Sequence, residues 1–82
     1  MVFVEFVSSN YPSAGDKHHF VGKDLAAVLA YTNGGKRFGF ADFTSHREIT
    51  EADARALGLG YLDEGIECVQ KKRTLAFMLK TP

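Results

Sequence analysis

The first apolar run of the chain predicts a strand that is covered on both faces. Residues 2–7 read VFVEFV, so apolar side chains fall at both odd and even positions, and Glu5 is the one polar residue among them. Val and Phe fit a pleated surface, and this pattern is typical of a strand with no solvent-facing side. Asn, Pro, Ser and Gly in residues 8–16 predict a loop. Residues 17–22 (KHHFVG) predict a second short strand that pairs back on the first.

Residues 23–31 (KDLAAVLAY) predict a short helix. Alanine is the best helix former, and three apolar residues at i, i+3 and i+4 share one face of such a helix. These residues are Leu25, Val28 and Leu29. Asp24 lies near the positive end of the helix dipole. Asn33 and the two glycines after it supply the left-handed conformations that end helices.

A second short helix is predicted over residues 51–57. Thr50, with Asp53 three residues later, is a variant of the capping box that begins helices. Glu51 and Asp53 fall in the first turn, where the helix dipole favours acidic side chains. Gly58 then provides a stop.

The remaining apolar segments predict three further strands. Residues 36–43 (KRFGFADF) alternate in the manner of one strand, and residues 65–70 and 73–80 are interpreted as a hairpin that turns at Lys71–Lys72. The order β(β)αβαββ predicts an α+β fold: a small, mostly antiparallel sheet with two short helices packed on one face. The sheet residues predicted to be buried are Val2, Val4, Phe6, Phe38, Phe40, Leu75, Phe77 and Leu79, and the helix residues predicted to cover them are Leu25, Val28, Leu29 and Leu57.

Composition fits one small globular domain over residues 1–82. With 45% apolar and 24% charged residues and no net charge, the chain differs from disordered proteins and carries no global field that points to DNA or an anionic membrane. No apolar run approaches the roughly 20 residues of a membrane helix, and the first residues lack the basic region of a secretory signal. The single cysteine suits a reducing compartment, so we expect a cytoplasmic protein.

Charged residues are segregated along the chain although they balance overall. Residues 48–67 are acidic, and the end of the chain is basic. Such patches either steer a partner of opposite charge or are solvated faces that attract each other weakly. The residues predicted to contact a protein partner are Glu48, Glu51, Asp53, Asp63, Glu64, Lys71, Lys72 and Arg73.

The histidines and the cysteine show no spacing that predicts a metal site or a catalytic group. His18 and His19 are adjacent, and adjacent residues of a strand point to opposite faces. His46 and Cys68 stand alone in the sequence, whereas zinc sites use paired ligands at short intervals. Cys68 lies in a predicted strand, where a small buried hydrophobe is expected. We therefore predict a protein that is not an enzyme and that holds no metal and no cofactor.

Two segments resemble known families. Residues 19–33 (HFVGKDLAAVLAYTN) resemble the Bro-type amino-terminal domain of phage antirepressors, which has an aromatic-Val-small-Lys-Asp strand end followed by an Ala/Leu helix and a Tyr-x-Asn exit. The resemblance implies an origin in a phage or mobile element, and hence the host cytoplasm as its location. The family continues with a basic helix, whereas this chain continues with a predicted strand, so the family's DNA-binding role is not carried over.

Residues 36–43 are similar to the RNP1 strand of RNA-recognition motifs, in which aromatic rings stack on bases. The departures are Arg37 in place of the family's Gly and Ala41 in place of a larger aliphatic residue. The resemblance implies a nucleic-acid-binding surface composed of Lys36, Arg37, Phe38, Phe40 and Arg47. The alternative is that Phe38 and Phe40 are core residues beneath a helix.

These observations lead to a preferred function and an alternative. The preferred function is a small protein-binding module that acts as a steric inhibitor of a host complex, in the manner of anti-CRISPR and other counter-defence proteins. A host complex that binds nucleic acid is the candidate partner. The alternative is a nucleic-acid-binding domain that uses residues 36–43 and the basic residues 71–73. A homodimer that pairs its last strand across a two-fold axis is compatible with both. Burial of both Phe38 and Phe40 favours protein docking, and exposure of both favours nucleic acid.

Overall fold

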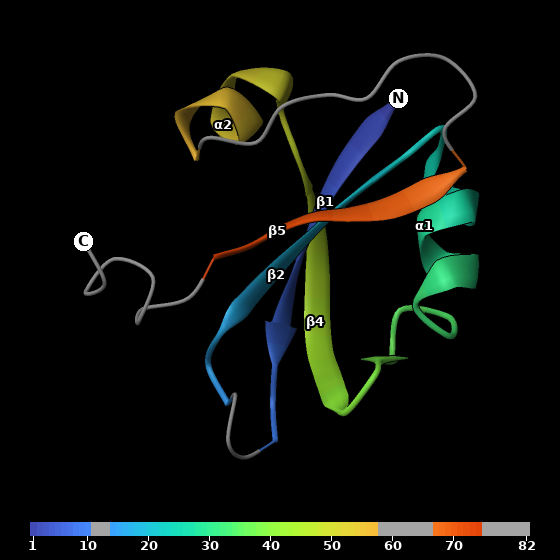
Figure 1. The fold of residues 1–82 in the computed structure, drawn as a ribbon, viewed down its shortest axis with the longest axis vertical. Coiled ribbons are helices and arrows are strands. Elements are labelled where there is room, and N and C mark those ends of the chain that lie inside the picture. Colours follow the sequence, from blue (N-terminus) through green and yellow to red (C-terminus); the bar gives the residue numbers. More distant parts are fainter. Residues whose placement is uncertain (11–13, 58–66, 75–82) are drawn as a thin grey trace.

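The computed structural model describes residues 1–10, 14–57 and 67–74, and in this part of the chain strands and helices follow the order ββαββαβ (Figure 1). The elements are β1 (Val2–Ser8), β2 (Lys17–Gly22), α1 (Leu25–Tyr31), β3 (Arg37–Phe38), β4 (Ala41–Ile49), α2 (Glu51–Ala56) and β5 (Cys68–Thr74).

The strands form one antiparallel sheet in the order β3-β4-β1-β2-β5. The sheet is strongly twisted, and β1 lies at its centre between β2 and β4 (Figure 1). In this register Glu5 of β1 lies opposite His19 of β2 on one side and Arg47 of β4 on the other. The predicted α+β class and the mostly antiparallel sheet are confirmed.

Both faces of β1 are covered, as the sequence predicts. Val4 and Phe6 belong to the larger apolar cluster, which also contains Val28 of α1. Phe3, of opposite parity, belongs to a second cluster that contains Ala54 of α2. Because neighbouring residues of a strand point to opposite faces, the two helices cover opposite faces of the sheet. The prediction that both helices pack on one face is therefore wrong.

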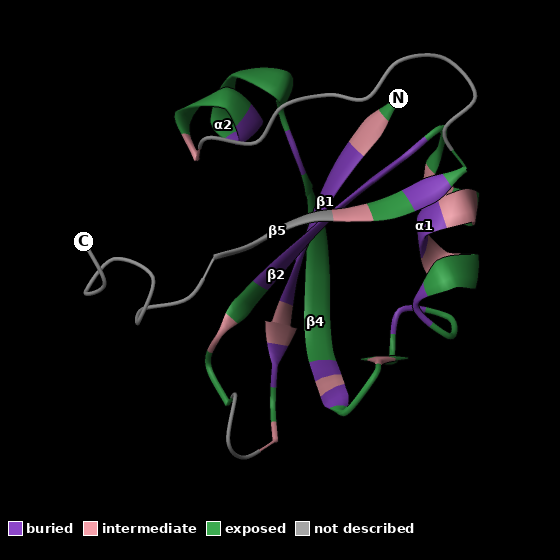
Figure 2. Cartoon of the chain, viewed as in Figure 1, coloured by how far each residue is buried: buried purple, intermediate pink, exposed green. Residues whose placement is uncertain are grey.

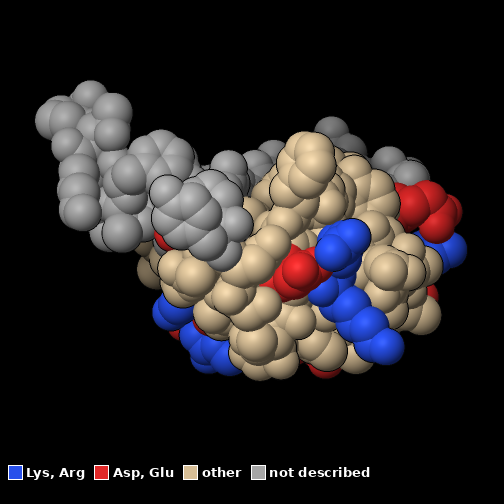
Figure 3. Space-filling view, turned by 90° about the horizontal axis from the view of Figure 1, so that it is seen from below, with Lys and Arg blue, Asp and Glu red and all other residues tan. Residues whose placement is uncertain are grey.

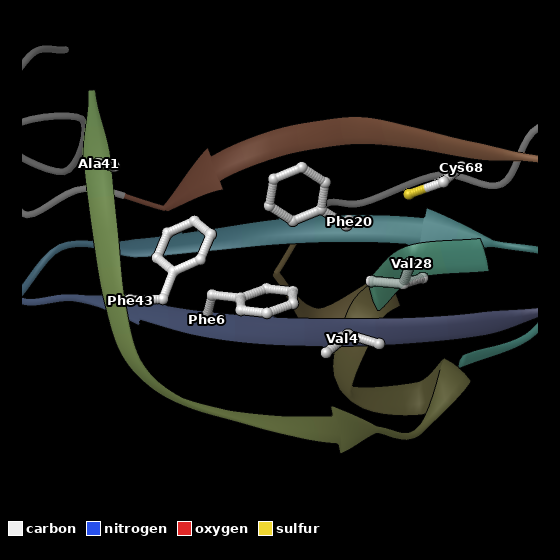
Figure 4. Close-up of a cluster of buried hydrophobic side chains, with 7 residues drawn as sticks. All are labelled: Val4, Phe6, Phe20, Val28, Ala41, Phe43 and Cys68. Atoms are coloured by element: carbon white, nitrogen blue, oxygen red, sulfur yellow. The ribbon is translucent and has the colours of Figure 1, made fainter. Parts of the chain in front are cut away.

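Three phenyl rings from three strands fill the centre of the larger cluster (Figure 4). The ring centroids of Phe6 and Phe43 lie 4.6 Å apart, and those of Phe6 and Phe20 lie 5.3 Å apart in an edge-to-face arrangement. Aromatic pairs at such separations contribute beyond the area that they bury. Val28 of α1 packs against the same cluster. The rings thus join β1, β2 and β4, and α1 covers part of them.

Side chains cap the first turns of both helices, Thr50 as predicted and Asp24 in addition to its predicted effect on the helix dipole. The carboxylate of Asp24 accepts a hydrogen bond from the backbone N–H of Ala27 at 2.9 Å, and Thr50 caps α2 through its hydroxyl, which accepts from the N–H of Asp53 at 3.0 Å. After α1, Asn33 has a φ of 53° and the two glycines that follow also have positive φ. These left-handed residues end the helix.

The single strand predicted over residues 36–43 is instead a hairpin. β3 comprises only Arg37–Phe38, the chain reverses at Gly39 and Phe40, and β4 continues to Ile49. Gly39 has a φ of 61°, and a glycine at the first position of a two-residue loop suits the hairpin turns whose twist matches that of the strands. Phe40 therefore lies in the turn and not in the predicted core.

The turn predicted at Lys71–Lys72 is also wrong, because β5 runs without interruption through both residues from Cys68 to Thr74. Antiparallel pairing with β2 explains this continuity, since every residue of β2 has a partner in β5. A register shift between His19 and Phe20 accommodates an additional residue of β5. The predicted strand at 73–80 lies outside the described residues beyond Thr74, as do Leu75, Phe77 and Leu79.

Candidate functional site

The tip of the β3–β4 hairpin presents an aromatic ring to solvent. Phe40 is 97% exposed, whereas the other exposed large apolar residues of the described chain are 39% to 55% exposed. Single apolar residues on a surface are common. A phenyl ring with almost its whole surface in water is unusual, and it makes the hairpin the first candidate for a contact surface.

Residues that follow β1 hold the backbone of the turn that carries Phe40. The amide of Asn10 donates to the carbonyl of Phe40 at 2.7 Å, and its oxygen accepts from the N–H of Asp42 at 2.9 Å. The N–H of Ser9 donates to the carbonyl of Asp42 at 2.8 Å. Across the hairpin, Nε of Arg37 lies 2.6 Å from the carboxylate of Asp42. The turn is thus held by the residues that follow β1 and closed by an ion pair across the hairpin.

The base of the hairpin rests on the aromatic core. Phe38 is half-buried, and its ring centroid lies 5.1 Å from that of Phe20 in an edge-to-face arrangement. Tyr31 at the end of α1 stacks on Phe38 at 5.4 Å and is 46% exposed. The two phenylalanines of the hairpin therefore have different environments: Phe38 packs against the fold, and Phe40 projects from it.

A second polar site lies at the middle of the sheet, around the buried carboxylate of Glu5. One carboxylate oxygen lies 3.0 Å from Nε2 of His19, and the other accepts from Nε of Arg47 at 3.0 Å. Nζ of Lys17 lies 4.0 Å from Glu5. The side chains of Glu5 and His19 are 7% and 1% exposed, whereas Lys17 and Arg47 are at least half exposed. This Glu5 cluster links β1 to both of its neighbouring strands.

The partners of Glu5 keep its carboxylate ionised. Burial alone would raise the pKa of Glu5, but the hydrogen bonds from His19 and Arg47 and the positive charges of Lys17 and Arg47 outweigh burial, so the pKa lies below its ordinary value. Burial, together with the positive charges of Lys17 and Arg47, lowers the pKa of His19 below its ordinary value despite the opposing effect of Glu5. His19 is thus a neutral imidazole, and it must carry its proton on Nε2 in order to donate to the carboxylate.

The acidic residues predicted to contact a partner are divided between described and undescribed parts of the chain. Glu48 is exposed on β4, and Glu51 and Asp53 are exposed in the first turn of α2. Glu51 accepts from Arg55 of the same helix at 3.1 Å. Asp63 and Glu64 lie outside the described residues.

The predicted basic contact residues Lys71, Lys72 and Arg73 lie within β5, and the structure describes their backbone only. On the face of the molecule shown in Figure 3, Lys and Arg side chains lie beside Asp and Glu side chains rather than in separate fields. The segregation of charge along the sequence is therefore not repeated on this face.

The structure separates the residues predicted to bind nucleic acid. Lys36, Arg37, Phe38 and Phe40 lie on or beside the hairpin, whereas Arg47 lies further along β4, where it binds Glu5. An RNP1 strand presents its rings from one continuous strand of a sheet. Because the chain reverses between Phe38 and Ala41, this geometry is absent from the segment.

Sequence reasoning missed the Glu5 cluster and the anchoring of the hairpin by Asn10. A lone carboxylate in an apolar strand was the available signal for the cluster, since a buried charge needs a partner. The identity of the partners was not accessible, because Arg47 lies 42 residues from Glu5 and only the strand register brings them together.

Cys68 is buried, as predicted, and burial raises the pKa of its thiol to about 11. Within residues 1–10, 14–57 and 67–74, no three His, Cys, Asp or Glu side chains are grouped so that they could hold a metal ion. No helix in the same residues has the length and apolar character needed to cross a membrane. Comparisons of the chain with protein-family models, curated proteins and solved structures find no match.

Proposed function

We propose that this chain is a protein-binding module whose contact surface is centred on Phe40. The observation that carries the proposal is a phenyl ring 97% exposed at the tip of a hairpin that hydrogen bonds hold in place. Aromatic residues on fixed backbones are typical anchors of protein interfaces, since little conformational freedom is lost when they enter a pocket. The partner would offer an apolar pocket for the ring and, at its rim, an acidic group for the exposed Lys36.

The pairing of the nearby cations favours a protein partner over nucleic acid. Arg37 is held by Asp42 at 2.6 Å, and Arg47 is held by Glu5 at 3.0 Å. Affinity for nucleic acid arises largely from cations that neutralise phosphates and release counterions. Arginines already neutralised by carboxylates contribute less to such binding, whereas burial of an aromatic ring in a protein pocket does not depend on them.

The form of action that we propose is steric inhibition of a host complex by a phage-derived or mobile-element protein. The resemblance of residues 19–33 to phage antirepressors and the small size of the chain support this form. Exposed acids at the end of β4 and the start of α2 offer a second contact for a basic site on the partner. These acids are Glu48, Glu51 and Asp53.

Two variants of Phe40 and one control variant test the proposal in affinity capture from cells that naturally carry the chain, with the captured partner then titrated directly. We expect Phe40→Ser to weaken binding by about 2 kcal/mol or more, roughly thirtyfold, as for an interface hot spot. Phe40→Leu should retain part of the affinity, because an apolar pocket accepts another apolar side chain. Val69→Thr, at another exposed apolar position, is the matched control. A partner that binds wild type and Phe40→Ser equally well would refute the proposal.

Nucleic-acid binding is the second candidate, and the exposure of the rings of Phe40 and Tyr31 and of the side chain of Lys36 is the observation in its favour. Fluorescence anisotropy with single-stranded and double-stranded oligonucleotides at low salt tests it. Binding through stacking would weaken with salt and would be lost in Phe40→Leu as fully as in Phe40→Ser, because leucine has no aromatic face. A flat titration would remove this candidate.

A further inference from the structure

In the described part of the chain, the outer edge of β4 is open over five residues. Residues 45–48 pair with β1 on one side, and the register shifts at Thr44, which has no partner in β1, while β3 pairs only with Ala41 and Asp42 on the other side. Every residue from Thr44 to Glu48 is exposed, and β4 is green over most of its length in Figure 2, in contrast to β1 and β2. An edge of this kind offers unpaired backbone groups to another strand.

Hydrogen bonds near the end of β1 establish which backbone groups face that edge. Ser8 donates its N–H to the carbonyl of Asp16 at 2.9 Å and accepts from the N–H of Gly15 at 2.8 Å, so the backbone groups of Ser8 face the β2 side. In an antiparallel ladder, successive residues direct these groups to alternate sides. The residues of β1 that face β4 are therefore Phe3, Glu5 and Val7.

The same alternation applies along β4. Its residues opposite Phe3, Glu5 and Val7 direct their backbone groups to β1, and they are Ile49, Arg47 and Ser45. The residues between them, His46 and Glu48, direct their N–H and C=O outward. Among the described residues no strand receives these groups.

We propose that two copies of this chain pair through this edge, with the two β4 strands antiparallel and a two-fold axis between the two copies of His46. The open stretch ends at β3 on one side and at Thr50, the N-cap of α2, on the other. His46 is its midpoint, so a pairing centred there spans residues 44–48 of both copies, with the regular part of β4 at residues 45–48 and the register shift at Thr44. The product is a continuous sheet across an isologous interface.

Charge selects this register over its neighbours. Centred on His46, the pairing places Ser45 opposite Arg47 of the second copy and Thr44 opposite Glu48, so no side chains of like charge face each other. A shift of two residues toward α2 would place Arg47 opposite Arg47, which is unfavourable. A shift of two residues the other way would place part of the pairing on Asp42, which β3 already occupies.

Charge substitutions at Ser45 test the interface by sedimentation equilibrium of the purified chain from micromolar to millimolar concentration. Ser45→Arg would face Arg47 twice in the dimer, and we expect the dissociation constant to rise on the order of tenfold. Ser45→Glu should lower it, because glutamate would face the same arginine. Ala56→Arg and Ala56→Glu make the same changes on the exposed face of α2 and should have no effect.

Disulfide trapping reports the register directly, in a Cys68→Ser background. His46→Cys should form a dimer on oxidation, since residues opposite each other in a hydrogen-bonded pair have Cα atoms about 5.5 Å apart. Thr44→Cys should not, because the two copies of residue 44 would be offset by four residues along the strands, about 13 Å. Phe40→Ser should leave the dimer unchanged, which keeps this test separate from that of the proposed function.

Three results would overturn the proposal. The first is a monomer at every concentration. The second is a dimer whose dissociation constant changes in the same direction with Ser45→Arg and Ser45→Glu. The third is trapping that is equally efficient for Thr44→Cys and His46→Cys.

Discussion

The two faces of the sheet are built on different physical principles. The face toward α1 is filled by three phenyl rings and Val28. The face toward α2 has a smaller apolar cluster around Phe3, and beside it on the same face lies the Glu5 cluster. Burial of apolar area depends little on pH, whereas a buried carboxylate and a buried imidazole depend on their protonation. The first face therefore holds the larger apolar cluster, and the second adds the Glu5 cluster, whose protonation makes stability responsive to acid.

The largest effect is expected at the centre of the aromatic face. Phe6 is fully buried and contacts two other phenyl rings, so Phe6→Ala should lower the free energy of unfolding by about 3–5 kcal/mol. A small domain is stable by only about 5–15 kcal/mol, so Phe6→Leu, with a smaller loss, provides a foldable variant. Urea denaturation measures both losses.

Phe40→Ala is the matched control for Phe6→Ala. It removes the same atoms from a ring that is 97% exposed, and it should change the free energy of unfolding by no more than about 0.5 kcal/mol. Similar losses at the two positions would contradict the placement of the two rings.

The contrast between Phe6 and Phe40 also illustrates how much of the structure can be predicted from the sequence. Both lie in segments with strand-like patterns, and in the first segment the apolar residues at both odd and even positions correctly predicted a strand covered on both faces. In the second segment the pattern alternates as in a strand, but Gly39 has a positive φ and the chain reverses there. A single glycine fits both a strand interior and a hairpin turn, so local pattern could not decide between them.

Features that depend on residues close in the sequence could be predicted, whereas features that depend on distant residues could not. The helix cap at Thr50 depends on a residue three positions away and was predicted, whereas Asp24 was predicted only as a charge that suits the helix dipole and is found to cap α1. The continuity of β5 depends on β2 as its partner, so turn-like residues at 71–72 gave a wrong prediction. The candidate contact surface shares Phe40 and Lys36 with the predicted nucleic-acid set, but exposure of the ring follows only from the observed turn.

The next largest effect is expected in the Glu5 cluster. Glu5→Gln keeps the shape of the side chain but replaces one acceptor by a donor, which must face either His19 or Arg47. We expect a loss of about 1–3 kcal/mol in the free energy of unfolding, because a buried polar group loses its partner. Glu48→Gln, on the exposed part of β4, should change stability by at most about 0.5 kcal/mol. Equal effects of the two substitutions would show that the cluster contributes nothing specific.

The N-caps of α1 and α2, the helices that cover the two faces, are expected to have smaller effects on stability. Asp24→Ala and Thr50→Ala each remove one acceptor from a helix N-terminus, and each should cost about 1 kcal/mol. Asp24→Asn and Thr50→Ser retain a capping oxygen and should restore most of the loss. Thermal unfolding of the four variants measures this, and a failure of the conservative substitutions to restore stability would argue against capping as the cause.

The smallest effect near neutral pH is the acid sensitivity of the face toward α2. The pKa of His19 in the folded protein lies below its ordinary value of 6.5, so the unfolded chain binds the proton more readily. Stability is then fully present above about pH 6.5 and falls as the pH drops toward the pKa of the folded state, by at most about 1.4 kcal/mol per pH unit for one proton. Glu5 adds a loss of the same sign below its ordinary pKa of 4.5.

Urea denaturation of wild type and His19→Gln between pH 8 and pH 5 isolates the contribution of His19, because titration of other groups is common to both proteins. The difference in the free energy of unfolding between wild type and variant should shrink as the pH falls through 6.5. In Phe6→Leu, on the aromatic face, the full pH dependence of the wild type should remain. A difference in the free energy of unfolding between wild type and His19→Gln that is the same at every pH would mean that the pKa of His19 is the same in the folded and unfolded states. The two faces would then differ in packing alone.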